Sequence, residues 1–277
     1  GAMPRLLRPL AALLALLLSA CALPPLDAAQ QARLASLLPA DALLLGEQHD
    51  APEHQQLQRQ VVQWLADRGQ LAAVVLEMAE AGHGTAGLPP DASARQVRAA
   101  LAWDDARWPW RTYGPVIMAA VAAGAPVLGA NLSLAQMREA MRQSALDDRL
   151  PAELLAVQRQ RIRDSHCGLL PEPRIDPMTR VQIARDIAMA DAVARAAQQA
   201  APGRVVLLIT GNGHVHRALG VPRFLPADLK AKVLSAQAQS AQAAIENEAL
   251  ADRALQAGDL RWPTPPLPPR DPCATLR

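Results

Sequence analysis

The fold is set by the segment ALLLGEQHD at residues 42–50, in which an uninterrupted apolar run ends at a glycine and a group of polar residues. A short apolar run that stops at a turn is typical of a strand buried on both faces. Similar runs recur at residues 71–76, 126–129, 204–210 and 231–234, with helical patterns between most of them. This alternation predicts an α/β fold, with a mostly parallel central sheet covered by helices on both faces and a site at the carboxyl ends of the strands.

Two of the intervening segments carry clear helix signals. Residues 52–68 space their large apolar side chains at helical intervals and stop at Gly69. Residues 176–199 do the same, and Asp176 and Pro177 suit an N-cap and the first helical position. Residues 79–90 hold three glycines and two prolines and are predicted to form a loop.

The composition excludes several classes of protein. The chain has 277 residues, of which 51% are apolar, with 28 Lys and Arg against 26 Asp and Glu. Charged, Gln and Pro residues interrupt the apolar content, so a disordered chain, a small disulfide scaffold and a polytopic membrane protein are not expected. A net charge of +2 and only two lysines give no basic patch for nucleic acid.

The amino-terminal residues are typical of a bacterial lipoprotein signal. Gly1 and Ala2 precede Met3 as a cloning remnant would, and Arg5 and Arg8 are followed by a short apolar run. The run ends in LSAC at residues 18–21, which matches a lipobox and predicts lipidation of Cys21. An ordinary secretory signal with an incidental cysteine is the alternative. Ala22, rather than Asp, after this cysteine favours the periplasmic face of the outer membrane of a Gram-negative bacterium.

The predicted organisation follows from these signals. A signal peptide occupies residues 1–20; the lipidated cysteine, a tether and a first helix occupy 21–40; the α/β domain covers 41–262; and a Pro-rich tail covers 263–277. In an oxidising compartment Cys167 and Cys273 could form a disulfide that ties the tail to the domain, or remain two free buried thiols. Their spacing alone does not choose between these alternatives.

Polar side chains follow four of the predicted strands and are expected to converge, because the carboxyl ends of parallel strands meet at one edge of the sheet. These candidate site residues are Glu47, His49, Glu77, Asn131, Asn212 and His214. For Asp50 the preferred interpretation is structural, because Asp50 and Glu53 have the spacing of a helix capping box.

One chemistry that fits these residues is a mononuclear metal site. His49 and His214, with Glu47 or Glu77, would supply two imidazoles and a carboxylate and leave a position for an activated water. The motifs of zincins, serine hydrolases, P-loops and dinucleotide-binding folds are absent from the sequence.

A second candidate site is aromatic. Trp103, Trp108, Trp110 and Tyr113 place four of the seven aromatic residues within an eleven-residue segment. Indole rings can pack against a macrocycle, a phenolate can ligate ferric iron, and Arg111 or Arg107 could pair with propionates. A small satellite core, with Tyr113 at the start of a helix, is the structural alternative.

Six ordered motifs together resemble the ChaN-type haem-binding lipoproteins, which are related to the Tiki, TraB and erythromycin esterase proteins. The motifs are the lipobox at Cys21, LGEQHD at 45–50, VLEM at 75–78, the segment 110–115, AN at 130–131 and GNGH at 211–214. The similarity extends from about residue 42 to residue 262.

This resemblance implies a periplasm-facing lipoprotein of iron acquisition that binds haem through a tyrosine, with two protomers enclosing a haem pair. Tyr113 is the only tyrosine available as that ligand, and His214 or His216, with Trp110 and Arg111, would support the haem. The wider superfamily implies the alternative, a metal-dependent peptidase or esterase that uses the GxxH motifs ending at His49 and His214. Haem capture does not itself require catalysis. A lipid-tethered scaffold without a ligand is a third class.

Overall fold

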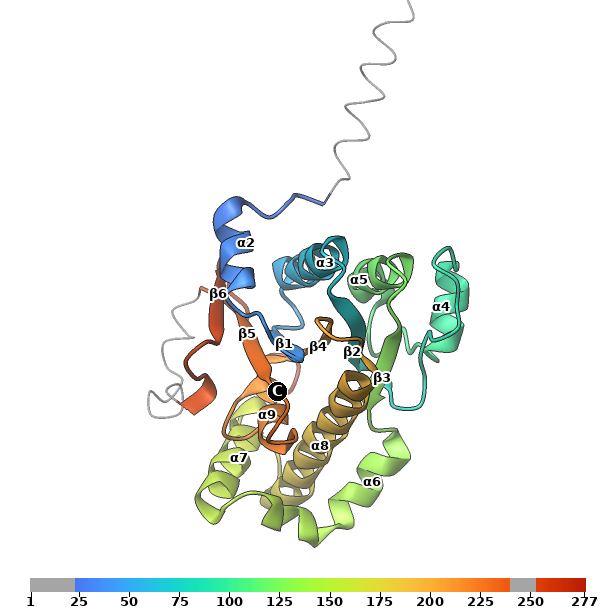
Figure 1. The fold of residues 1–277 in the computed structure, drawn as a ribbon. Coiled ribbons are helices and arrows are strands. Elements are labelled where there is room, and N and C mark those ends of the chain that lie inside the picture. The colour runs from blue at the N-terminus through green and yellow to red at the C-terminus, as the bar shows by residue number, and fades with distance from the viewer. Residues whose placement is uncertain (1–22, 240–252) are drawn as a thin grey trace, which may run out of the picture.

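The computed structural model describes residues 23–239 and 253–277, so the predicted signal segment and Cys21 lie outside the described residues. The sheet contains strands in the order β3-β2-β4-β1-β5-β6, and all neighbouring strands in it are parallel (Figure 1). The predicted α/β fold class is confirmed. The strands are β1 (Ala42–Glu47), β2 (Leu71–Glu80), β3 (Val127–Asn131), β4 (Val205–Gly211), β5 (Ala231–Ala238) and β6 (Leu260–Thr264).

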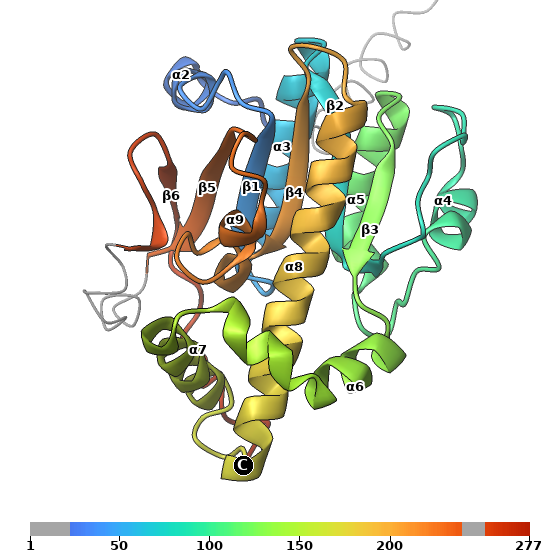
Figure 2. The ribbon, with the colours of Figure 1, turned by 60° about the horizontal axis from the view of Figure 1, so that its bottom comes forward.

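Helices cover both faces of this sheet. The pair α3 and α5 lies on one face and the long helix α8 lies on the other, while α6 and α7 extend beyond the end of the sheet (Figures 1 and 2). The helices are α2 (Ala28–Ala35), α3 (Pro52–Asp67), α4 (Ala94–Ala100), α5 (Trp110–Ala122), α6 (Leu134–Arg142), α7 (Ala152–Ser165), α8 (Ile175–Gln199) and α9 (Val221–Phe224). Short 3-10 turns occupy Ser144–Arg149, Glu172–Arg174 and Asn212–Val215.

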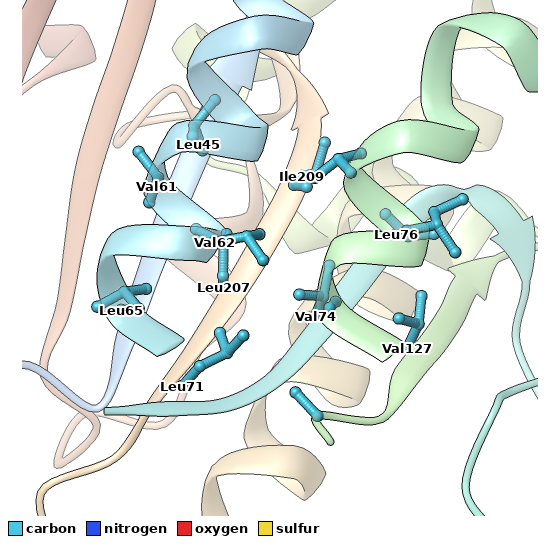
Figure 3. Packing of buried hydrophobic residues seen from close by; sticks show 14 of the residues in the cluster. Leu45, Val61, Val62, Leu65, Leu71, Val74, Leu76, Val127, Leu207 and Ile209 are labelled. Carbon is cyan, nitrogen blue, oxygen red and sulfur yellow. The ribbon is translucent and has the colours of Figure 1, made fainter. Parts of the chain in front are cut away.

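Two apolar layers hold the helices on the sheet. Along β1, Leu43 and Leu45 pack in the layer under α3 and α5, whereas Ala42 and Leu44 pack in the layer under α8. Figure 3 shows part of the first layer, where side chains of β1, β2, β3 and β4 meet those of α3. Successive residues of the inner strands β1 and β4 are buried and point alternately into the two layers, so a shift of one residue would exchange the side chains of the two layers.

The strands expected from the sequence are present, and the structure adds one. Strand β6 pairs with β5 at the junction between the predicted domain and its Pro-rich tail. Prolines at 263, 265 and 266 made an extended tail the simpler expectation, but an edge strand tolerates proline because it needs partners on one side only.

The two predicted helix starts differ in detail. Helix α8 begins at Ile175, directly after a 3-10 turn, so Asp176 lies in its first turn and accepts a hydrogen bond from Arg159 Nε at 2.7 Å instead of capping it. The N-cap of α3 is Ala51, which makes no side-chain cap. The capping box predicted for Asp50 is therefore wrong.

A disulfide joins Cys167, just after α7, to Cys273 in the tail, with a Cα–Cα distance of 5.9 Å. Of the two alternatives for these cysteines, the bridge is the one present. Among residues 23–239 and 253–277, no helix has the length and apolar character needed to cross a bilayer.

Candidate functional site

The candidate site lies where the carboxyl ends of β1, β2 and β4 meet α5 and α8. His49 leaves β1 and passes so close to β4 that a Cβ on Gly211 would stand 3.0 Å from its Nε2. Glycine at this position therefore lets the imidazole lie against the backbone. As predicted, the polar residues that follow the strands share one edge of the sheet, and they form two adjacent clusters that meet at Gly211.

Glu47 organises the first cluster. Its side chain is fully buried, and Oε1 accepts hydrogen bonds from the Tyr113 hydroxyl at 2.6 Å and from His49 Nδ1 at 2.8 Å. Its Oε2 accepts from the amides of Gln55, at 2.7 Å, and Gln58. Four donors compensate the buried charge, as a carboxylate in the interior requires.

His49 is the member of this cluster that reaches solvent, with 44% of its side chain exposed. Because Nδ1 faces Glu47, Nε2 is the nitrogen that Glu47 does not bond, and it lies beside Gly211 of β4. Burial by itself lowers the pKa of His49, but the hydrogen bond to Glu47 and the charges of Glu77 and Glu47 outweigh it, so the pKa is raised. The ring also contacts the indole of Trp108 edge-on, at 5.0 Å between centroids.

Glu77 organises the second cluster. Its Oε2 accepts hydrogen bonds from the Thr210 hydroxyl at 2.7 Å and from the Gly211 amide at 2.8 Å, and Oε1 is paired with Arg185 of α8. Burial alone would raise the pKa of Glu77, but His214 and Arg185 hold it well below its usual range. The carboxylate therefore remains ionised in the interior.

His214 lies between two carboxylates. Its Nδ1 is 2.6 Å from Asp186 of α8 and its Nε2 is 3.5 Å from Glu77. Although burial lowers the pKa of His214, the charges of Glu77 and Asp186 raise it to about 9. Burial in turn raises the pKa of Asp186, despite the neighbouring imidazole.

Tyr113 lies inside the protein and not on its surface. The residue is 1% exposed, and its hydroxyl donates to Glu47. Burial and the negative charge of Glu47 raise the pKa of Tyr113. A phenolate ligand needs an accessible, deprotonated oxygen, so this conformation does not offer Tyr113 to a haem iron.

The other predicted site residues are distributed around the two clusters. Asn131 accepts a hydrogen bond from Arg185 Nε at 3.1 Å and thereby supports the Glu77 cluster. Asn212 bonds to β5, with its Nδ2 donating to Ala236 O. His216 is buried, and its Nδ1 accepts from the Ala218 amide at 3.2 Å, outside both clusters. These contacts give Asn212 and His216 structural roles.

The aromatic segment packs against the main apolar layer under α3 and α5 and does not form a satellite core of its own. Trp110 packs edge-on against Trp103, at 5.2 Å between centroids, and lies under the guanidinium of Arg98. Trp108 instead contacts both His49 and Tyr113. The segment therefore belongs to the main core, and Trp108 connects it to the rings of His49 and Tyr113.

The residues proposed for a metal do not fit one. Both oxygens of Glu47 and both oxygens of Glu77 already accept hydrogen bonds from protein donors. Among the residues that the structure describes, no three His, Cys, Asp or Glu side chains are grouped to hold a metal ion. A metal would have to displace buried donors, each of which would lose its partner.

A cavity of about 500 Å³ opens beside His49, between the start of α3 and the start of α5. Its rim carries Arg59 and Arg111, and within residues 23–239 and 253–277 neither guanidinium has a hydrogen-bond or ion-pair partner. A larger groove of about 970 Å³ runs on between α3, α5 and residues 23–26. The two hollows share Leu23, Arg59 and Pro115, so they adjoin.

Several members of the clusters were not predicted: Arg185, Asp186, Gln55 and Gln58. A signal was present for two of them. Asp186 lies three residues after Ile183 and four before Ala190, on the apolar stripe of its helix, and Gln58 lies three before Val61. A polar residue on a buried stripe requires a partner in the interior.

Comparison with known proteins agrees with this architecture. Residues 33–225 match the model of the family described as haem-binding uptake, Tiki superfamily, ChaN. The chain belongs to this family. Among solved structures, this ChaN-family protein is similar to one described as "Cofacial heme binding to ChaN of Campylobacter jejuni", with 23% identity, a TM-score of 0.57, and coverage of 74% of this chain and 84% of that one.

A second solved structure, of the type III effector HopBA1, is also similar, with 15% identity, a TM-score of 0.41, and coverage of 71% of this chain and 77% of that one. No curated protein matches the sequence.

Proposed function

We propose that this ChaN-family protein binds haem in the cavity beside His49. The observation that carries the proposal is the combination, on one rim, of a partly exposed imidazole with two arginines that have no partner among the residues that the structure describes. Haem needs a ligand for its iron, an apolar surface for its ring and cations for its propionates, and the cavity offers each of these.

His49 is the proposed iron ligand. Its Nδ1 faces Glu47, which orients the ring and increases the basicity of Nε2, as a carboxylate partner does for ligating histidines. Tyr113 then acts on the ligand indirectly, because its hydroxyl shares the same carboxylate oxygen. This assignment replaces the direct tyrosine ligation implied by the resemblance.

The adjoining groove supplies the apolar surface. Pro115, Met118 and Ala119 of α5 and Trp64 of α3 line it, next to Arg59. The arginines at 59 and 111 would pair with the propionates of haem at the rim. A flat, amphiphilic dianion fits this combination better than a small polar substrate does.

The proposed cellular role follows from the family and the amino-terminal signals. A lipid on Cys21 would anchor the protein at the periplasmic face of the outer membrane, where it takes part in haem or iron acquisition. Two protomers that each present a partly exposed haem would associate through these apolar surfaces, so we propose a homodimer in the haem-bound state. The receptor or transporter is not assigned.

A haemin titration followed by absorbance and by mass tests the proposal. His49→Ala should weaken haemin binding by about tenfold or more and shift the Soret band, because the iron loses its protein ligand. Tyr113→Phe should keep both the band position and most of the affinity. His83→Ala is the matched control, because His83 is exposed and its backbone hydrogen bonds go to Glu80 and Gly129, which are not members of either cluster.

The results for the two variants distinguish His49 from Tyr113 as the ligand of the haem iron. Loss of a ferric-phenolate spectrum in Tyr113→Phe, with unchanged binding by His49→Ala, would show that the phenol leaves Glu47 and ligates the iron. Failure of the unmodified protein to bind haemin at all would reject the haem proposal itself.

A second candidate function is hydrolysis by acid–base catalysis. The observation that favours it is the presence of two imidazole–carboxylate pairs at one edge of the sheet, His49 with Glu47 and His214 with Asp186. Such a pair positions an imidazole to accept a proton from water. In this interpretation His49, the exposed imidazole, is the general base.

The turnover of ester and peptide substrates, measured with and without a chelator, tests this candidate function. Turnover that resists the chelator, and is lost in His49→Ala but kept in His83→Ala, is the expected result. Turnover that requires an added divalent ion would instead support the metal-dependent alternative.

A further inference from the structure

The carboxyl-terminal tail starts at a point fixed to the site. Thr264, the last residue of β6, lies 2.7 Å from Nε2 of the buried His54. His54 Nδ1 accepts the amide of Gln48, so Nε2 carries the hydrogen and donates it to the threonine hydroxyl. Because Gln48 precedes His49, the first residues of the tail are held beside the loop that carries the partly exposed imidazole of His49.

The other end of the tail is fixed on the opposite side of the site. The disulfide between Cys273 and Cys167 attaches it to the end of α7. Helix α7 borders the turn after β4, because Arg161 Nη2 would lie 3.3 Å from a Cβ on Gly213. Figure 2 shows the chain end beside α7 and the first turns of α8. The tail therefore runs from the β1 side of the site to its β4 side.

The composition of the tail makes it stiff. Residues 263–272 read PTPPLPPRDP, and a chain so rich in proline is held extended, at about 3.1 Å per residue. Prolines restrict the chain between its two fixed ends, and the disulfide restricts it further. Most of the segment is exposed, so its position depends on these attachments and not on burial.

Between its ends the tail contacts the rim of the cavity beside His49. Arg270 Nη1 lies 3.7 Å from Asp50 Oδ2, and Asp50 lines that cavity together with Arg59 and Arg111. Arg270 is therefore bound to a residue that lines the same cavity as Arg59 and Arg111. Its bond to Asp50 is exposed and weak, so a stronger anion could compete for it.

We propose that residues 265–277 form a tethered strap across the rim of the His49 cavity at Asp50, which limits access to His49 and adds Arg270 to the groups that bind an anionic ligand. The segment lies beyond the residues that match the family model, which end at 225. The identity of the ligand rests on the proposed function, whereas the limit on access to His49 does not.

Access to His49 can be measured without haem, from the rate at which diethyl pyrocarbonate modifies His49, followed by peptide mass. In Cys167→Ser/Cys273→Ser the strap loses its second attachment, and the rate should rise about threefold or more because the segment opens locally. His83 serves as an internal control and should react at the same rate in both proteins. Arg270→Ala keeps the disulfide and should raise the His49 rate by a smaller factor.

The contribution of Arg270 is measured with haemin. Arg270→Ala should weaken binding by about twofold to fivefold, as expected for an exposed ion pair, and Arg142→Ala, in an exposed pair on α6, should leave it unchanged. Unchanged His49 rates in both the double-serine and the Arg270 variants would overturn the strap. Increased His49 rates in a protein that does not bind haemin would support the strap and reject the haem proposal.

Discussion

The two imidazole–carboxylate pairs share one edge of the sheet but differ in their surroundings. His49 with Glu47 leaves 44% of the imidazole side chain exposed, whereas His214 with Asp186 leaves 6%. The buried pair also has Glu77 and Arg185 as neighbours, so two cations face two anions in the interior. An imidazole paired with a carboxylate is therefore buried in one place, where it supports the fold, and partly exposed in the other, where we propose that it meets a ligand.

The largest expected effect comes from removing the cation that balances the buried cluster. Arg185→Met leaves Glu77 buried with one partner fewer, which should lower the free energy of unfolding by about 3 to 5 kcal/mol, measured by urea denaturation. Arg142→Ala, which breaks an exposed pair on α6, should cost less than about 1 kcal/mol.

Equal, small losses in these two variants would remove the distinction between a structural and an exposed cluster. In that case the buried pair would have to be treated as a second ligand site.

A smaller effect is expected in the pH dependence of stability. The pKa of His214 is raised to about 9 from an ordinary value of 6.5, so its stabilising contribution is complete below pH 6.5 and is lost as the pH rises towards 9. The free energy of unfolding should therefore fall across this interval. Unfolding by urea at a series of pH values measures the slope.

The comparison is sharpened by substituting each histidine. His214→Gln should flatten the slope between pH 6.5 and 9 more than His49→Gln does, because His49 is partly exposed and solvent screens its partners. The opposite order would mean that the exposed pair contributes more to folding than the buried one. At acidic pH, the lowered pKa of Glu77 predicts a loss of stability as this carboxylate is protonated.

Sequence patterns predicted the elements well where one local rule dominated. The runs at β1, β2, β3, β4 and β5 are apolar because both faces of each strand are covered, and such runs are visible without a structure. The patterns did not predict β6. Its prolines are tolerated because β6 is an edge strand, and this position is known only from the arrangement of the whole sheet. The patterns failed again at Asp50, which has the spacing of a cap but faces the tail.

The sequence predicted that the candidate site residues converge at one edge of the sheet, but not how they pair with one another there. Parallel strands bring Glu47, Glu77 and His214 to one edge, and that follows from topology. The division into two clusters does not, because it depends on Arg185 and Asp186 from α8 and on Gln58 from α3. Their positions on apolar stripes indicated only that each needed a buried partner.

The sequence by itself determined the layered α/β fold, the family, and the gathering of acids and histidines at the strand ends, because apolar periodicity and local motifs are properties of short segments. Only the tertiary structure decided that Tyr113 lies inside with its hydroxyl on Glu47, that His49 is the imidazole left accessible, and that Cys273 meets Cys167. Exposure and pairing arise from segments far apart in the chain, so no local pattern could assign the ligand.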